Sequence, residues 1–265
     1  MSEQRGARSP RFQPSVVAAL VAWAVYEIIF YGLAAMPGVP YAEWFATAEN
    51  GLRTAVIPLV AGAVFLLIFA FVSRWDHLWS DPVRLKSTMT MKVALVIWVA
   101  LIIMRIVGTK WNEIPLPLLG AMIAAGIGVG FAEELMFRGI FLRGMRAGRR
   151  SERSAAIWTA VAFGLLHVPN MFLGTGIAGA SQIVLAALSG LLLYAWRRQW
   201  GLIWPAMVAH GMWDISAFAT GQAARPWLLL TSLPATAVLA VLGILVLVSI
   251  ARHDADVVAI PEEAV

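Results

Sequence analysis

The sequence predicts an all-α fold: a polytopic transmembrane helical bundle of about eight spans, with both termini in the cytoplasm. Of its 265 residues, 60% are hydrophobic and only 13% are charged, and the mean hydropathy is +0.79. Soluble domains carry about 25% charged residues. This composition therefore indicates a membrane protein, and the length suits a single helical bundle.

A helix needs roughly 20 apolar residues to cross a bilayer, and eight apolar stretches are close to this length. They are residues 15–36, 51–72, 90–108, 116–137, 154–170, 177–196, 202–220 and 226–250. The first stretch is too long for a removed signal peptide and lacks a good cleavage site, so we expect a retained helix.

The positive charges predict how the bundle is oriented. The net charge is +5, and 16 of the 20 lysines and arginines fall on one side of the predicted bundle. Arg53, Lys110 and Arg225 fall on the other side, and Arg105 lies within the third span. The positive-inside rule places the richly basic side, with both termini, in the cytoplasm. We interpret the basic loops as topology signals and anionic-lipid contacts, and we expect no nucleic-acid partner.

The chain divides by the position of its polar residues. We expect a cytoplasmic N-terminal segment at 1–14, accessory transmembrane helices at 15–115 and a catalytic helical core at 116–220. A C-terminal transmembrane helix at 221–252 and a cytoplasmic tail at 253–265 follow. The expected location is the cell membrane, with multiple passes. The chain has no cysteine, which excludes disulfides, thiol catalysis and cysteine-ligated metal.

Three polar clusters lie inside otherwise apolar helices of the predicted core. An ionisable group at membrane depth is costly and is usually functional. Estimates from helical rise place the clusters at similar depths, in the cytoplasmic half of the bilayer. We therefore expect the clusters to meet in one site. They are Glu133 and Glu134 with Arg138, then His167, then His210 with Asp214.

The spacing within the first and third clusters predicts how their members act. Glu134 and Arg138 are four residues apart, so they share a helix face and can pair. Glu133 then faces a different neighbour and is free to act as a general base for water. His210 and Asp214 are also four apart, so the aspartate can orient the imidazole. Each cluster also has a structural interpretation, as charges at a helix end or as hydrogen bonds between helices.

These residue types favour hydrolysis of a peptide bond by an activated water. The sequence lacks a GxSxG nucleophile motif, a pair of intramembrane aspartates and the HExxH motif of zinc proteases. We expect Glu133 and His167 to activate water, and His210 with Asp214 to stabilise the oxyanion. We expect no cofactor. The alternative is zinc bound by Glu133, His167 and His210, because two histidines and a glutamate form a known ligand set.

The three clusters resemble the motifs of the CAAX-protease and bacteriocin-processing family, which includes the type II CAAX prenyl proteases. EELMFR at 133–138 is similar to the family's EExxxR motif, FGLLH at 163–167 to FxxxH, and HGMWD at 210–214 to HxxxN/D. The resemblance implies a glutamate-type intramembrane endopeptidase that cleaves a membrane-associated or lipidated protein or peptide. It implies that Glu133 and His167 activate water and that Glu134 and Arg138 support them.

Position 214 departs from the prenyl-protease pattern, in which asparagine is expected. An ionised aspartate cannot donate a hydrogen bond. Asp214 must therefore be protonated, act through His210 or have another role, which leaves prenylated substrates open. The alternative function is a catalytically silent membrane scaffold or regulator of the same fold. A transporter would show paired, interrupted helices in two similar halves, and the sequence shows none.

Two further charges lie inside predicted spans. Glu27 is in the middle of the first span, and Arg105 is near the outer end of the third. We expect them to pair and to join these two helices.

Overall fold

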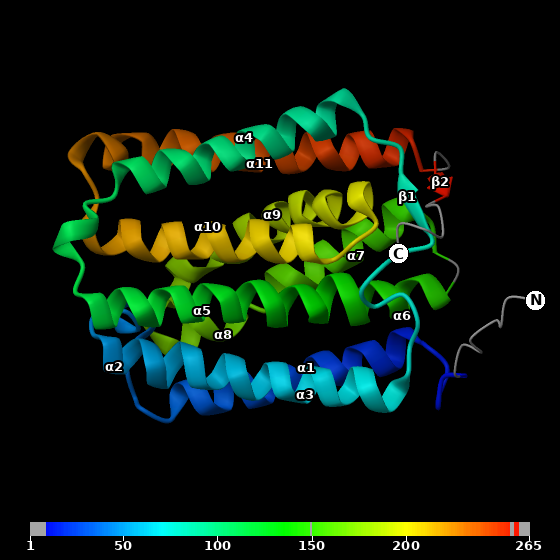
Figure 1. Cartoon of the computed structure of the whole chain (residues 1–265), viewed down its shortest axis with the longest axis horizontal. Helices are drawn as coiled ribbons and strands as arrows, with labels where there is room; N and C mark the ends of the chain where they lie inside the picture. Colours follow the sequence, from blue (N-terminus) through cyan, green and yellow to red (C-terminus); the bar gives the residue numbers. More distant parts are fainter. Residues whose placement is uncertain (1–8, 149, 255–256, 260–265) are drawn as a thin grey trace, which may run out of the picture.

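A computed structural model describes residues 9–148, 150–254 and 257–259, and it shows a bundle of long helices (Figure 1). The eight longest follow the eight expected stretches. They are α1 (Val16–Ala35), α3 (Ile57–Ser73), α4 (Met89–Gly108), α5 (Leu116–Glu134), α7 (Glu152–Leu165), α9 (Gly179–Trp200), α10 (Trp204–Ala223) and α11 (Pro226–Arg252). The predicted all-α bundle is confirmed.

The short elements connect these helices. The helical ones are η1 (Tyr41–Glu43), α2 (Ala48–Gly51), η2 (Leu52–Val56), η3 (Trp111–Glu113), η4 (Leu135–Phe141), α6 (Leu142–Ala147), α8 (Val168–Asn170), η5 (Met171–Thr175) and η6 (Gly176–Ala178). The strands β1 (Val83–Leu85) and β2 (Val257–Ala259) pair antiparallel at one end of the bundle.

Six helical stretches of the described chain are long and apolar enough to cross a membrane. One of them, Glu152–Trp200, folds back on itself, because α7 and α9 pack against each other. The reversal passes through Gly174 and Gly176, whose φ angles of +113° and +55° suit glycine. The helix α10, Trp204–Ala223, is not among these six stretches, although it is packed inside the same bundle. The number of spans stays a prediction.

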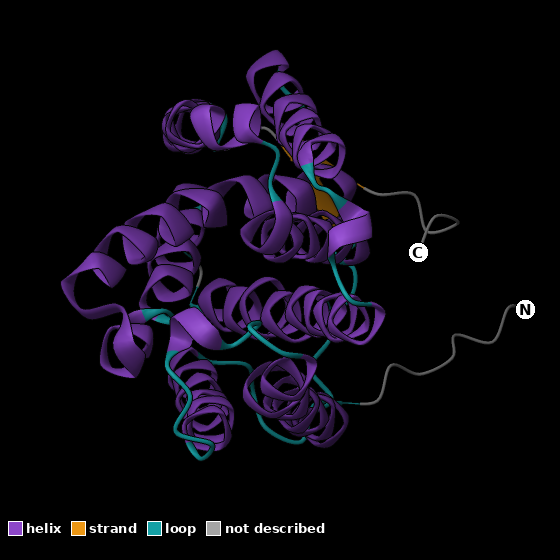
Figure 2. Ribbon diagram, turned by 90° about the vertical axis from the view of Figure 1, so that its left-hand side faces the viewer, coloured by secondary structure: helices purple, strands orange, loops and turns teal. Residues whose placement is uncertain are grey.

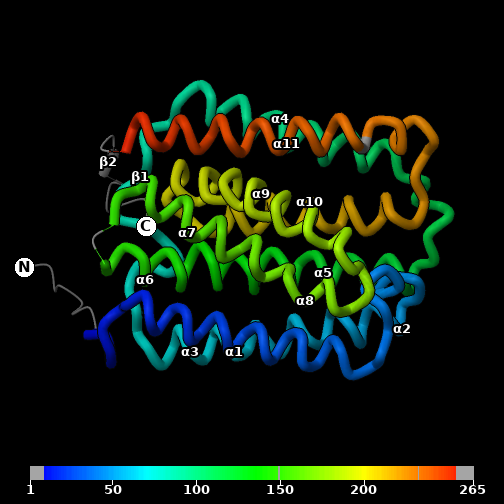
Figure 3. The backbone as a smooth tube through the Cα atoms, turned by 180° about the vertical axis from the view of Figure 1, so that it is seen from behind, coloured from blue at the N-terminus to red at the C-terminus, as the bar shows by residue number. Residues whose placement is uncertain are grey.

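The bundle has three layers, seen from the side in Figure 1 and end-on in Figure 2. The α1–α3 pair and the α4–α11 pair lie on opposite sides, and α5, α7, α9 and α10 lie between them. Figure 3 shows α7 and α9 on the rear face, joined by the reversal around α8. The helices that carry the polar clusters are therefore the central ones.

Glycines bring α5 and α10 into backbone contact. A Cβ atom on Gly130 would lie 2.4 Å from the carbonyl oxygen of Met207, and one on Gly211 would lie 2.8 Å from that of Gly126. Small residues at such positions let membrane helices approach closely. This close packing fixes the distance between Glu133, one turn past Gly130, and His210, next to Gly211.

Serine and threonine side chains cap the helices that start at the basic end of the bundle. Ser15 accepts a hydrogen bond from the amide of Ala18 at 3.1 Å, and Thr88 accepts one from Met91 at 3.2 Å. Such caps satisfy amides that have no partner within the helix. The start of α1 and the end of α11 lie at this same end, beside α6 and β1 (Figure 1).

Several arginines at this end are buried in an ion-pair network. Arg146 contacts Asp81 at 2.8 Å and Glu152 at 3.1 Å, and Arg198 contacts Glu152 at 2.6 Å and Asp81 at 3.1 Å. Arg197 contacts Asp81 at 3.2 Å. The interpretation of these residues as topology signals and lipid contacts is incomplete, because they also fasten the 76–85 loop to α6, α7 and α9.

The predicted topology can be tested with reporter fusions. Fusions after residues 40, 80, 112, 148, 172, 199, 223 and 260 should alternate between the two sides of the membrane, starting outside. The physical reason is the strong excess of basic residues on one side. An external signal from the last fusion would contradict cytoplasmic termini.

Candidate active site

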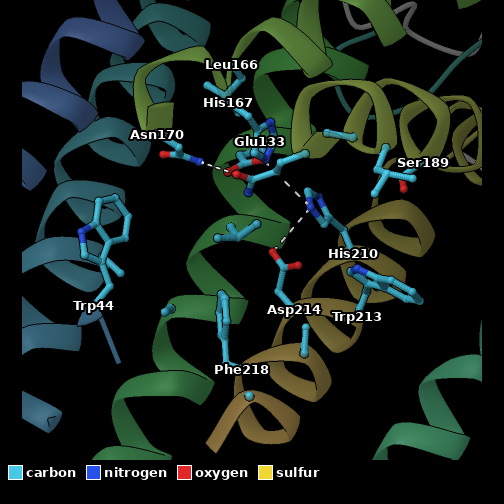
Figure 4. A pocket seen from close by; sticks show the side chains of 18 of the residues that line it. Trp44, Glu133, Leu166, His167, Asn170, Ser189, His210, Trp213, Asp214 and Phe218 are labelled. Carbon is cyan, nitrogen blue, oxygen red and sulfur yellow. Dashed lines mark hydrogen bonds and ion pairs between the residues drawn. The ribbon is translucent and has the colours of Figure 1, made fainter. Parts of the chain in front are cut away.

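One cavity of about 600 Å³ in the central layer brings the polar clusters together (Figure 4). Glu133 enters it from the last turn of α5, His167 from the junction of α7 and α8, and His210 with Asp214 from α10. The remaining wall is mostly aromatic and apolar. The structure therefore gathers four of the predicted site residues around one space.

Glu134 and Arg138 lie behind the cavity wall as a fully buried pair. Arg138 donates from Nη1 to Glu134 Oε1 at 2.8 Å and from Nη2 to the carbonyl oxygen of Gly190 at 2.9 Å. Its guanidinium also lies 4.5 Å from the centre of the Phe163 ring. The prediction that Glu134 and Arg138 share a helix face and pair is confirmed. Glu134 is not part of the cavity lining.

Glu134 also fixes the ring of His210. Nδ1 of His210 lies 2.8 Å from Glu134 Oε1, so this nitrogen donates to the carboxylate. Nε2 faces the cavity, 3.6 Å from Asp214 Oδ2 and 3.9 Å from Glu133 Oε2. The sequence suggested Asp214 as the orienting partner, but the shorter contact is to Glu134.

A backbone contact orients His167. Its Nδ1 lies 3.1 Å from the carbonyl oxygen of Phe163, which can only accept, so Nδ1 carries a proton in this contact. In the neutral ring Nε2 is then an acceptor, the state needed to hold a water proton. The Phe163 ring packs edge-on against both imidazoles, with centroid distances of 5.6 Å to His167 and 5.4 Å to His210.

A chain of neutral polar groups extends from His167 along the cavity. Asn170 Nδ2 donates to Gln182 Oε1 at 3.1 Å, and Gln182 Nε2 donates to the hydroxyl of Tyr41 at 2.9 Å. All three residues line the cavity. Their amide and hydroxyl groups belong to no motif, so the sequence did not point to them. The only local signal is that Asn170 lies three residues after His167.

The prediction that Glu27 pairs with Arg105 is wrong. Their helices, α1 and α4, lie on opposite sides of the bundle (Figure 1). Arg105 instead lines the same cavity as His210, where the central carbon of its guanidinium lies over the Trp213 ring, 3.8 Å from the ring centre. Hydropathy places both charges in spans, but it does not show which spans are neighbours.

The donor set does not match a zinc site in its present arrangement. No group of three His, Cys, Asp or Glu side chains in the described residues could hold a metal ion. Zinc requires ligand distances of about 2.0–2.2 Å around one point. Of the alternative ligands, His210 already directs Nδ1 to Glu134, and its Nε2 is 3.9 Å from Glu133. The absence of a cofactor stays a prediction.

These features define the class of protein: a multi-pass helical membrane protein with buried acid and imidazole groups around one cavity. Residues 115–216 match the family model of type II CAAX prenyl endopeptidase Rce1-like proteins. The match supports membership of the chain in the CAAX-protease and bacteriocin-processing family, and it spans all three motifs. The predicted resemblance to this family is thereby confirmed for residues 115–216. A comparison with curated proteins found no match.

The family supports endopeptidase activity of the CAAX type in general. It also supports association with a lipid bilayer and a protein or peptide substrate. The matched segment covers the central helices α5 to α10 and stops within α10, just beyond Asp214.

Proposed function

We propose that this protein is a glutamate-type intramembrane endopeptidase, which uses Glu133 and His167 to activate water against a peptide bond in a membrane-associated or lipidated substrate. The observation that carries the proposal is the meeting of Glu133, His167 and His210 on one mostly apolar cavity (Figure 4). Apolar walls strengthen the electrostatic contacts made inside such a cavity.

The proposed reaction uses the carboxylate of Glu133 and Nε2 of His167, which both face the cavity. A water held by Glu133 and by Nε2 of His167 gives a proton to the Glu133 carboxylate, and its oxygen bonds to the scissile carbonyl carbon. The carbonyl π electrons move to oxygen and form the oxyanion. When the intermediate collapses, the C–N bond breaks, and the proton held by Glu133 passes to the leaving nitrogen.

His210 is the group placed to stabilise the oxyanion. Its Nδ1 proton is directed to Glu134, so a donor toward substrate requires a second proton on Nε2. The imidazolium form donates to Glu134 and to the oxyanion at once. Asp214, 3.6 Å from Nε2, supplies negative charge next to this proton, and so does Glu133 until it takes the proton of the water.

Variants at position 214 test whether Asp214 acts through His210. Asp214→Asn should retain partial activity with a changed pH profile, because the amide keeps the shape but removes the charge 3.6 Å from Nε2. If Asp214 instead donates directly to the oxyanion, Asn should substitute well and activity should persist to higher pH. Asp214→Ala should be poor in either case. An Ala variant equal to wild type in rate and pH dependence would remove Asp214 from the site.

Elemental analysis of the purified protein tests the expectation that no zinc is required. We expect far less than one zinc per chain and activity that survives chelators, because the acid and imidazole groups come from separate helices without a compact ligand set. About one zinc per chain, with activity lost on chelation and restored by zinc, would reassign Glu133, His167 and His210 as ligands.

The proposed function is tested with a quenched fluorescent peptide that carries a farnesylated cysteine near its C-terminus. The matched control is the same peptide without the prenyl group. Wild-type protein in proteoliposomes should cleave one or both peptides, and their ratio reports whether the lipid is recognised. A wild type that binds peptide but never cleaves would favour a silent scaffold.

A further inference from the structure

Arg105 is a cation in this cavity, and it forms no salt bridge with the residues that the structure describes. It lies in the last turn of α4, and its guanidinium stacks on Trp213. Its Nη1 atom is buried and has no hydrogen-bond partner among the described residues. A charged residue within a membrane span is costly and usually functional, so Arg105 is expected to serve a binding function.

Neighbouring carboxylates do not explain this arginine. Glu27, the expected partner, is part of α1, which lies on the opposite side of the bundle from α4 (Figure 1). Asp214 is near enough to interact electrostatically with Arg105, but its ion-pair contact is with Nε2 of His210. Within the described chain, Arg105 therefore keeps hydrogen-bond donors to offer to a molecule in the cavity.

Trp213 supports the guanidinium, whose central carbon lies 3.8 Å from the centre of its ring. The Trp213 ring itself packs on Trp98, with 4.7 Å between the ring centres. A stacked guanidinium keeps its N–H groups in the ring-parallel plane, where they can form two parallel hydrogen bonds to one carboxylate. An apolar, aromatic cavity wall with one such donor group suits a hydrophobic peptide that carries a single carboxylate.

The position of Arg105 places that carboxylate close to the scissile bond. Arg105 contacts Trp213, whose neighbour Asp214 faces the catalytic His210. An extended peptide advances about 3.3–3.6 Å per residue. A substrate with its scissile carbonyl at His210 would therefore bring a carboxylate to Arg105 within a few residues of the cut.

We propose that Arg105 is a specificity-determining residue that binds a carboxylate of the substrate, within a few residues of the scissile bond. This inference rests on the proposed function. The carboxylate has two possible sources: the free C-terminus of the peptide, or an acidic side chain near it.

Binding to a Glu133→Gln protein separates this inference from catalysis. Three forms of the farnesylated peptide serve as probes: a free acid, a C-terminal amide, and an amide with glutamate as its last residue. The free acid should bind at least about tenfold more tightly than the plain amide, as expected for a desolvated charge pair. Tight binding of the glutamate amide as well would identify a general carboxylate site, whereas weak binding would identify the C-terminal α-carboxylate.

Substitution at position 105 assigns the preference to Arg105. In the Glu133→Gln background, Arg105→Gln should lower the affinity for the free acid to that for the plain amide, and Arg105→Lys should restore part of the difference. In otherwise wild-type protein, Arg105→Gln should raise KM for the free acid more than it lowers kcat. Arg53→Gln, which alters an exposed arginine in an ion pair with Glu49, is the control and should preserve the preference.

Two results would overturn the inference. One is equal affinity for all three peptides, measured on the Glu133→Gln protein that still contains Arg105. The other is an equal loss for all three peptides in Arg105→Gln, the signature of a structural role through Trp213 and Asp214. A wild type that never cleaves, combined with an Arg105-dependent preference, would reject the protease and retain the carboxylate site.

Discussion

Replacing Glu133 with glutamine is expected to lower peptide cleavage by about 10²–10⁴-fold, because the variant loses its general base for water. The amide has nearly the same shape, so the helix packing and the cavity should persist. The measurement is turnover of the farnesylated peptide, with membrane level and elution on size-exclusion chromatography as checks of folding.

A matched control for this variant is Glu113→Gln. Glu113 is half-exposed in η3, where it pairs with Lys110 at 3.1 Å, and it is not among the residues that line the cavity. We expect it to retain near-normal turnover. If Glu133→Gln also retained near-normal turnover, Glu133 would not be the base, and the assignment of protease chemistry to this residue would be wrong.

Removing the Glu134 carboxylate is expected to have the largest effect on stability. Glu134→Ala leaves the guanidinium of Arg138, which has no exposed surface, without its charged partner. Breaking a buried ion pair on one side costs about 3–5 kcal/mol. The measurement is the midpoint of thermal unfolding in detergent, which should fall sharply.

The chain contains a second Glu–Arg pair with the same four-residue spacing, which provides the control. Glu49 and Arg53 are both more than half exposed, at 76% and 58% of the side-chain surface. Exposed pairs contribute only about 0–1 kcal/mol, so Glu49→Ala should hardly shift the midpoint. Equal shifts in the two alanine variants would contradict a stabilising role for the buried pair.

A double variant separates stability from catalysis at this pair. Glu134→Leu with Arg138→Met replaces both charges by apolar groups, which often restores stability in buried positions. The same variant removes the acceptor 2.8 Å from Nδ1 of His210. We therefore expect recovered folding but reduced cleavage, because the imidazole is no longer held in place.

The sequence determined the fold class and singled out the acid and imidazole residues of the candidate site, because both depend on composition and local spacing. Long apolar stretches must form helices in a bilayer, since helices satisfy their own backbone hydrogen bonds. Polar residues are rare in such helices, so Glu133, His167 and His210 stood out individually. The four-residue spacing of Glu134 and Arg138 predicted a contact within a single helix, which required no knowledge of the neighbouring helices.

The tertiary structure decided every contact that depends on which helices are neighbours. Backbone contact at Gly130 and Gly211 packs α5 against α10. As a result, Nδ1 of His210 donates to Glu134, and Asp214 is not its only partner. Arg105 lies in the cavity instead of pairing with Glu27, because α4 packs far from α1. Hydropathy does not show how each helix is rotated about its axis or which helices are neighbours in a bundle. These are fixed by close packing of side chains between segments that are distant in the sequence.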